Sequence, residues 1–142
     1  MQEFILDKLQ LLIERKLIKG IGENGTEYTV IAQILDLPKE ILRLIQKFDF
    51  TKKNPKLIYI NTGETMISLQ DSILVTFLNL AGFDILFFVP TGYQSVEKYF
   101  TGNLMEEHQI GEYKYDMQVP DLNNISTNST RPSWRRKLFR RG

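Results

Sequence analysis

The one histidine of the chain, His108, stands in an acidic stretch that could carry acid–base chemistry. Glu106 and Glu107 precede it, and Glu112 and Asp116 follow. An imidazole beside a carboxylate can act as a general acid or base, because its pKa lies near neutrality. The same side chains offer ligands for a hard metal, but three successive residues point in different directions on a helix. We therefore take Glu107 and His108 as candidate catalytic residues, predict no metal site, and favour a solvated surface turn as the competing interpretation.

A second group of polar residues follows two predicted strands, at residues 56–60 and 85–89. The segments Asn61–Thr65 and Pro90–Tyr93 come directly after these strands. In an open parallel α/β sheet, ligands bind outside the carboxyl ends of the strands, and glycines there let the backbone approach a ligand closely. The competing interpretation is ordinary strand-to-helix turn chemistry. The candidate ligand-binding residues are Asn61, Thr62, Glu64, Thr91, Gly92 and Tyr93.

The predicted helix that opens at Ser68 would direct its positive end at the same loops. Such an end favours an anion, so the sequence predicts a phosphate-bearing ligand there. Glu64 and Asp71 would partly neutralise this site. Nucleotide-binding motifs add no support, because the G-x-G-x-x-G pattern at residues 20–25 follows a predicted helix and no Walker pattern occurs. The sequence therefore identifies no cofactor.

These candidates depend on a strand–helix–strand unit in the middle of the chain. Residues 56–60 and 85–89 are β-prone, and the second run is apolar throughout, which is typical of strands covered on both faces. Between them, Ser68 precedes Asp71 at capping-box spacing, apolar residues recur at helical period, and Gly82 can end the helix. The crossover should be right-handed. Two strands do not make a stable sheet, so further strands must come from this chain or from a longer protein.

Helices are predicted before this unit. Apolar residues at three- and four-residue steps indicate helices over residues 4–17, 30–35 and 38–48, with Gly20 as the left-handed cap of the first. The run at residues 28–31 is also β-prone, and the helical interpretation is preferred there because of the spacing of the apolar side chains.

Less regular structure is expected after the unit. Ser95 is expected to cap a short helix, and Glu112–Val119 alternates polar and apolar residues as an edge strand does. The predicted class is α/β, with N-terminal helices, a βαβ unit of a parallel sheet and a disordered basic tail. The segments are a helical part (1–50), an α/β part (51–122) and the tail (123–142); the first two form one domain or the C-terminal part of a larger one.

The net charge of +1 hides a basic C-terminus. Residues 131–142 hold six basic side chains and no acid, so the rest of the chain carries 12 basic against 17 acidic side chains, a net charge of −5. Trp134, Leu138 and Phe139 could share one helix face, which suits an anionic membrane surface or nucleic acid, with a solubilising tail as the third interpretation. No secretory signal or transmembrane segment is recognisable, so a cytoplasmic location is expected.

Five segments of the chain together carry a resemblance to a known family. They are Lys56–Thr62, Ser68–Asp71, Gly82–Ile85, Pro90–Tyr93 and Glu107–Tyr113. With them, residues 4–122 resemble the C-terminal region of the YceG-like family, described as a component of a "biosynthetic module" associated with tellurite-resistance and stress operons. The resemblance implies a bacterial, cytoplasmic, stress-associated protein in a biosynthetic or nucleotide-linked system. It also implies proteins several times longer than this chain, and it gives no reaction.

Two functional hypotheses follow. In the first, the chain is a ligand-binding or catalytic part of a biosynthetic protein that recognises a nucleotide or sugar phosphate, and the loops at Asn61 and Thr91 form one pocket. In the second, it is a non-catalytic assembly module for partners encoded in the same operon. That module would expose an apolar face on its N-terminal helices and have no pocket.

Overall fold

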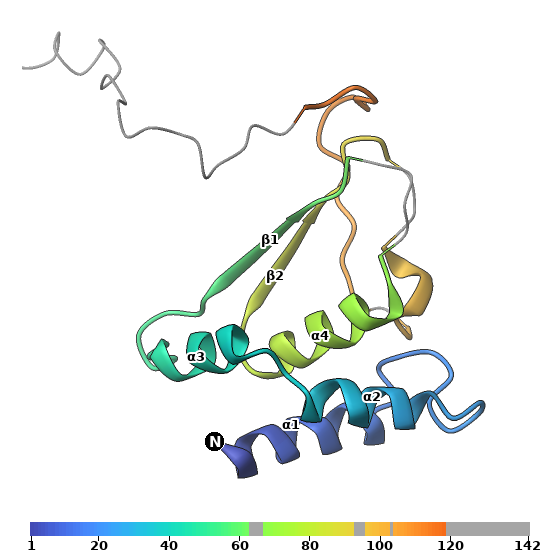
Figure 1. Ribbon diagram of the computed structural model, residues 1–142. Coiled ribbons are helices and arrows are strands. Elements are labelled where there is room, and N and C mark those ends of the chain that lie inside the picture. Colours follow the sequence, from blue (N-terminus) through green and yellow to red (C-terminus); the bar gives the residue numbers. More distant parts are fainter. Residues whose placement is uncertain (63–66, 93–95, 103, 119–142) are drawn as a thin grey trace, which may run out of the picture.

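The computed structural model describes residues 1–62, 67–92, 96–102 and 104–118 (Figure 1). These residues have the predicted α/β organisation, with N-terminal helices followed by a strand–helix–strand unit. The elements in order are α1 (Gln2–Glu14), α2 (Thr26–Leu35), α3 (Lys39–Lys47), β1 (Lys56–Ile60), α4 (Leu69–Leu80), β2 (Asp84–Phe88) and the short 3-10 helix η1 (Glu97–Tyr99). The predicted cap at Ser95 and the basic tail lie outside the described residues.

The strand–helix–strand unit is confirmed. β1 and β2 pair in parallel, in a register that joins Lys56 to Asp84 and Ile60 to Phe88. The hydroxyl of Ser68 accepts the backbone N–H of Asp71 at 3.0 Å, which is the predicted cap of α4. The turn after α4 contains Gly82 at φ +102°, a conformation that favours glycine.

Helix α4 forms the centre of the core. Ile73, Phe77 and Leu78 on this helix are almost completely buried. α1 and α2 both pack against α4, while the sheet lies on its other side, so α4 is the middle layer of the fold (Figure 1). In the described part of the chain, no helix is long and apolar enough to cross a membrane.

The first helix ends earlier than predicted. α1 stops at Glu14, and Lys16 takes a left-handed backbone with φ +47°, so Gly20 does not cap this helix. The helix ends in a local Schellman motif, because the N–H of Leu17 donates to the carbonyl of Leu12 at 3.2 Å and the N–H of Lys16 donates to that of Ile13 at 3.0 Å. Just past this turn, the hydroxyl of Thr101 donates to the carbonyl of Lys16 at 2.6 Å. The left-handed position of the cap is therefore taken by Lys16, four residues before the predicted Gly20, and a tertiary hydrogen bond holds the turn.

The predicted edge strand over Glu112–Val119 is wrong for the residues described, which run to Gln118. Residues 112–118 contain no strand. Their one described backbone bond outside the segment runs from the N–H of Lys114 to the carbonyl of Pro90, at 2.8 Å. Tyr113, Tyr115 and Met117 remain about half exposed or more, so the alternation of polar and apolar residues buries no common face.

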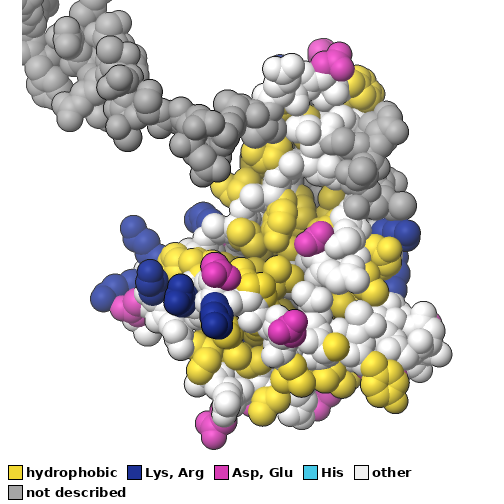
Figure 2. Space-filling model, in the orientation of Figure 1, with side chains coloured by type: hydrophobic (Ala, Val, Ile, Leu, Met, Phe, Trp, Pro, Cys, Tyr) yellow, Lys and Arg dark blue, Asp and Glu magenta, His cyan; other side chains and the backbone are white. Residues whose placement is uncertain are grey.

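The expectation that the strands are covered on both faces is also wrong within the described chain. Exposed and half-buried residues alternate along β1 and β2. On the α4 side, the ring of Tyr59 stacks on that of Phe87 with centroids 5.1 Å apart. On the other side the apolar residues stay exposed. Figure 2 shows that hydrophobic side chains reach the surface of the molecule in this orientation. These exposed residues are Ile58, Ile60, Leu86 and Phe88.

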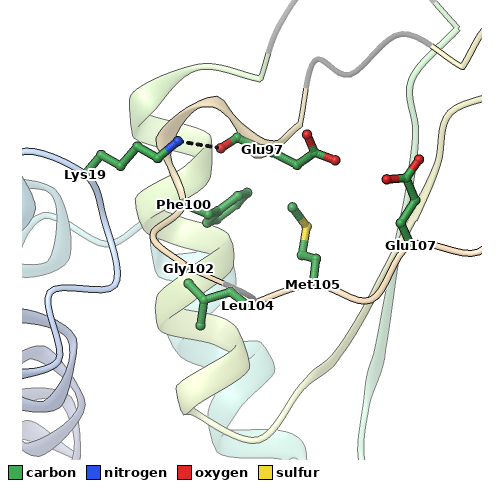
Figure 3. Close-up of a pocket in the computed structure, with 7 residues that line it drawn as sticks. All are labelled: Lys19, Glu97, Phe100, Gly102, Leu104, Met105 and Glu107. Carbon is green, nitrogen blue, oxygen red and sulfur yellow. Dashed lines mark hydrogen bonds between the residues drawn. The ribbon is translucent and has the colours of Figure 1, made fainter.

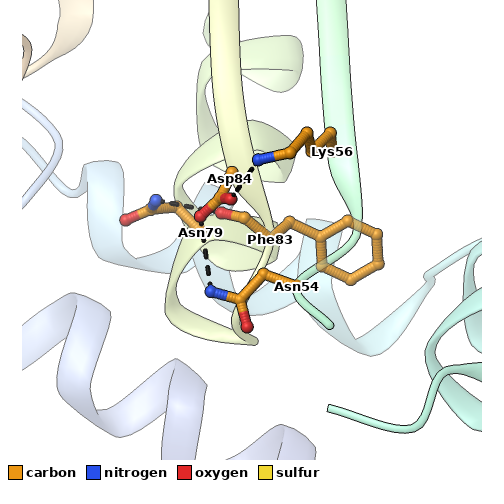
Figure 4. A network of polar contacts seen from close by, with 5 residues as sticks. All are labelled: Asn54, Lys56, Asn79, Phe83 and Asp84. Carbon is orange, nitrogen blue, oxygen red and sulfur yellow. Dashed lines mark hydrogen bonds and ion pairs between the residues drawn. The ribbon is translucent and has the colours of Figure 1, made fainter. Parts of the chain in front are cut away.

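A polar network joins the beginnings of the two strands (Figure 4). The ammonium of Lys56 lies 2.8 Å from a carboxylate oxygen of Asp84, and the amide of Asn54 donates to the other oxygen at 3.5 Å. Nearby, the amide of Asn79 donates to the carbonyl of Phe83 at 3.2 Å and so closes the turn before β2. The hydrogen bond from Lys56, followed by that from Asn54, lowers the pKa of Asp84 below its ordinary value.

This shift predicts the pH dependence of an Asp84→Asn variant. Because the pKa is lowered on folding, the contribution of Asp84 is fully present above the ordinary aspartate pKa and is lost as pH falls through the lowered pKa. Stability measured by urea unfolding between about pH 2 and pH 6 should therefore fall less steeply for Asp84→Asn than for the natural chain. High salt should reduce the difference, since both side chains are solvated. Parallel acid profiles at low salt would contradict the assignment.

Candidate functional site

The structure brings four of the six predicted ligand-binding residues to one edge of the sheet. The N–H of Asn61 donates to the carbonyl of Phe88 at 2.8 Å, so the end of β1 is joined to the end of β2. Asn61 and Thr62 leave the sheet there, and Thr91 and Gly92 follow β2 from the same edge. We call these four residues the rim. The other two, Glu64 and Tyr93, lie outside the described residues.

Thr91 is the rim residue with an unexplained polar group. Its side chain is 5% exposed, and its hydroxyl oxygen is buried without a hydrogen-bond partner among the described residues. Leaving a buried hydroxyl unpaired costs about 1–3 kcal/mol, so such groups are uncommon in folded proteins. A ligand would recover the lost interaction by displacing the side chains that cover this hydroxyl.

Gly92 is a position where a side chain does not fit, but the reason is not the predicted ligand. It adopts φ +68°, and its N–H donates to the carbonyl of Val89 at 3.0 Å. A methyl group built on Gly92 would overlap the aromatic ring of Tyr113. The ring of Tyr113 therefore occupies the space beside Gly92. The sequence had predicted that a ligand would approach the backbone closely at this point.

The sequence did not predict that Tyr113 lies beside the rim, because no local pattern connects the two. It lies 21 positions after Gly92, in a segment without regular structure. The backbone bond from Lys114 to Pro90 holds this segment against the loop that follows β2. Tyr113 and Lys114 are thus rim neighbours that only the tertiary structure reveals.

The N-terminus of α4 already has an acidic partner. The carboxylate of Asp71 accepts the hydroxyl of Ser68 at 2.7 Å, in the first turn of the helix. Burial, and then the charge of Asp71, raise the pKa of the Tyr59 hydroxyl. The carboxylate of Asp71 therefore offsets much of the partial positive charge at this helix end, which was expected to attract an anion.

The candidate catalytic residues are not arranged as a bonded pair. His108 lies 3.6 Å from Glu106, and the two side chains are 75% and 92% exposed. Glu107 lines a cavity, and no described contact joins it to His108. Glu107 is likewise exposed to solvent. Among residues 1–62, 67–92, 96–102 and 104–118, no group of three or more acidic or histidine side chains could hold a metal ion.

Two cavities lie beside the segment that contains Glu107, away from the rim. The first has a volume of about 360 Å³ (Figure 3), and the second, of about 300 Å³, extends along β2 and α4. They share Phe100, Leu104 and Met105. The ammonium of Lys19 donates to the carbonyl of Glu97 at 3.5 Å at the edge of the first cavity. Neither cavity contains a rim residue, so the expected single pocket at Asn61 and Thr91 is not one of them.

Sequence reasoning could not find these cavities. Their walls come from the loop after α1, from α4 and β2, and from the segment around Met105, which are far apart in the chain. The second cavity is mainly apolar, and two of its three polar side chains already make hydrogen bonds. Thr76 donates to the carbonyl of Ser72 at 2.8 Å, and Asn79 donates to that of Phe83, while the third residue, Glu106, is exposed. It offers packing space with few free hydrogen-bonding groups.

Comparison with known proteins places the chain in a family. It is 31% identical over 93 residues to a protein of Bacillus subtilis (strain 168) whose name is "Uncharacterized protein YceG". The match covers 63% of this chain and 17% of the relative, so the chain spans less than a fifth of that protein's length. No solved structure matches the chain. The YceG domain model matches residues 1–130, and the chain therefore belongs to the YceG domain family.

Proposed function

We propose that this chain binds a phosphate-bearing small molecule, of the nucleotide or sugar-phosphate class, at the rim of β1 and β2. The observation that carries the proposal is the hydroxyl of Thr91, which is buried at the carboxyl edge of a parallel sheet with no described partner. Ligands of α/β proteins bind at this edge. The proposal is for binding and assigns no reaction.

The charges around the rim suggest how such a ligand would lie. The carboxylate of Asp71 at the start of α4 disfavours a phosphate group there. Lys114 is bonded through its backbone to Pro90 on the other loop, so a basic residue is anchored on that side. The hydroxyl-bearing part of the ligand would contact Thr91 and Asn61, and its phosphate would lie toward Lys114.

The resemblance to the YceG-like family sets the biological context of the proposal. A protein encoded with tellurite-resistance and stress genes, in a system that builds a small molecule, would need to recognise a nucleotide or sugar-phosphate precursor. The relative described above is several times longer than the matched segment. The rim would then supply one side of a binding site in a larger protein.

Thr91→Val tests the proposal, because valine keeps the shape of threonine and removes only the hydroxyl. Ribose 5-phosphate and AMP serve as probes in isothermal titration calorimetry. The variant should bind the better probe about tenfold more weakly than the natural chain, a loss of about 1.4 kcal/mol. Thr91→Ser is the matched control and should retain binding.

The fold itself should tolerate the change. The hydroxyl makes no described hydrogen bond, so Thr91→Val should leave the free energy of unfolding unchanged or raise it by about 1 kcal/mol. If both probes bind Thr91→Val as well as the natural chain, the site at the rim is refuted. A marked loss of stability would show instead that the hydroxyl has a structural partner.

A second candidate function is the assembly module for partners of the same operon. The observation that favours it is the exposure of apolar side chains on the N-terminal helices: Tyr28 is 73% and Leu35 64% exposed, and their seven-residue spacing places them on one face of α2. Leu6 on α1 is 52% exposed. Such a module would keep its partner binding in Thr91→Val and lose it when Tyr28 and Leu35 are both replaced by serine.

A further inference from the structure

The sheet has one face that no described residue covers. Ile58, Ile60, Leu86 and Phe88 are 56%, 45%, 49% and 46% exposed, and all four lie on the side of the sheet opposite α4. We call these four residues the open face. Hydrophobic side chains gather over the sheet in the space-filling view (Figure 2). Four adjacent apolar side chains that are each about half exposed form a hydrophobic patch, which is typical of an interaction surface.

The strand pattern indicates what kind of layer is missing. A parallel sheet is normally covered by helices on both faces, and a single crossover helix such as α4 can cover only one of them. The residues of β2 between its ends are apolar on both alternations, which is typical of a strand with helices on each side. The missing layer is therefore expected to be helical.

The outer edge of β1 also indicates that a neighbouring part of the structure is missing. The N–H of Asn61 donates to Phe88, and the carbonyl of Pro55 accepts from Asp84. Alternate residues of a parallel strand face its neighbour, so the backbone groups of Ile58 and Ile60 are directed away from β2. Within the described residues, β1 pairs with β2 alone. An edge of this kind, beside an open apolar face, is typical of a strand inside a wider sheet.

The size of the open face argues against a second copy of the chain as the cover. Four half-exposed side chains offer on the order of 400 Å², against roughly 800 Å² for each partner in a stable complex. A segment joined to the same polypeptide needs less area, because its effective concentration is high. The relative from Bacillus subtilis supplies such segments, since the match spans 17% of its length.

We infer that the open face is the docking site of an amphipathic helix supplied by the rest of a YceG protein. A strand of five residues is roughly 17 Å long, so a helix of about eleven residues would cover the face along its length. Its apolar side chains would recur at three- and four-residue steps. The Lys56–Asp84 ion pair would lie at one end of this contact and stay in water. The inference does not depend on a ligand at the rim.

Single cysteines test the inference, because the chain contains no cysteine of its own. Leu86→Cys places a thiol on the open face, and Glu40→Cys places one on an exposed polar position of α3 as the matched control. Each variant is made in the 142-residue chain and in a cysteine-free Bacillus subtilis YceG protein whose matched segment is replaced by this chain. The measured quantity is the rate of maleimide labelling.

In the isolated chain both thiols should react quickly. In the long protein the rate for Leu86→Cys should fall by at least about tenfold, while the rate for Glu40→Cys should stay the same within about threefold, because a covered thiol reacts only after local opening. Equal rates for Leu86→Cys in the two proteins would overturn the inference. Protection that appears in the isolated chain as its concentration rises, together with a dimer in light scattering, would also overturn it in favour of a second copy.

A hybrid protein that lacks a cooperative thermal transition would require a second measurement. The same labelling is then applied to the unmodified Bacillus subtilis protein, with cysteine at the position that aligns with Leu86. Protection in the whole protein but not in its isolated matched segment supports the inference. Equal labelling in both refutes it.

Discussion

Phe77→Ala is expected to lower the free energy of unfolding by about 3–5 kcal/mol. Phe77 is 0% exposed at the centre of α4, the layer that contacts both the sheet and the N-terminal helices. Removing its ring leaves a cavity in the middle of the fold, and a domain of this size has a total stability of only about 5–15 kcal/mol. Urea unfolding followed by circular dichroism should show a much earlier midpoint or no cooperative transition.

Phe88→Ala is the matched control, because it removes the same ring from the open face. Phe88 is 46% exposed, so the loss should be about 1 kcal/mol in the isolated chain. The comparison holds the chemistry constant and changes only the surroundings of the ring. Similar losses for the two variants would mean that the core is not centred on α4, or that the open face is covered in the isolated chain.

Local sequence signals predicted the central unit because its boundaries depend on residues close together in the chain. Ser68 caps α4 through a residue three positions away, and Gly82 takes the left-handed turn that follows. The strands were predicted to within one residue, since β-prone side chains and the flanking polar residues mark both ends. The parallel direction then follows from the length of the connection.

The predictions of secondary structure were wrong where contacts with distant residues contribute to the local structure. α1 ends early at a Schellman turn on Lys16, where glycine is the usual residue, and Thr101, 84 or more positions away, bonds the carbonyls of Lys16 and Leu17. The segment after His108 alternates like a strand, yet its fixed point is the bond from Lys114 to Pro90. Neither interaction leaves a pattern within a short window of sequence.

The candidate site also combines features that local sequence predicts with features that depend on the tertiary structure. That Asn61 and Thr91 share an edge was predictable, because parallel strands end on the same side. The burial of the Thr91 hydroxyl and the ring of Tyr113 above Gly92 were not, since both depend on how the later segment folds back. The ligand chemistry at the rim stays a prediction, with Thr91→Val as its test.

Gly92→Ala is expected to destabilise the chain by about 2–3 kcal/mol, more than the backbone conformation alone explains. At φ +68° any side chain is strained, by about 1–2 kcal/mol. The added methyl group would also displace the ring of Tyr113, which packs directly over this glycine. The measurement is the free energy of unfolding from urea titration.

Gly102→Ala separates these two causes. Gly102 has a similar φ of +59°, but a methyl group there would meet nothing within 4 Å, so its cost should be the backbone strain alone. In the double variant Gly92→Ala with Tyr113→Ala, the overlap is absent, and the cost of adding the methyl group should fall to that of Gly102→Ala. If Gly92→Ala costs no more than Gly102→Ala in the natural background, Tyr113 does not rest on the rim. The space above Gly92 would then be open to a ligand, as the sequence alone had predicted.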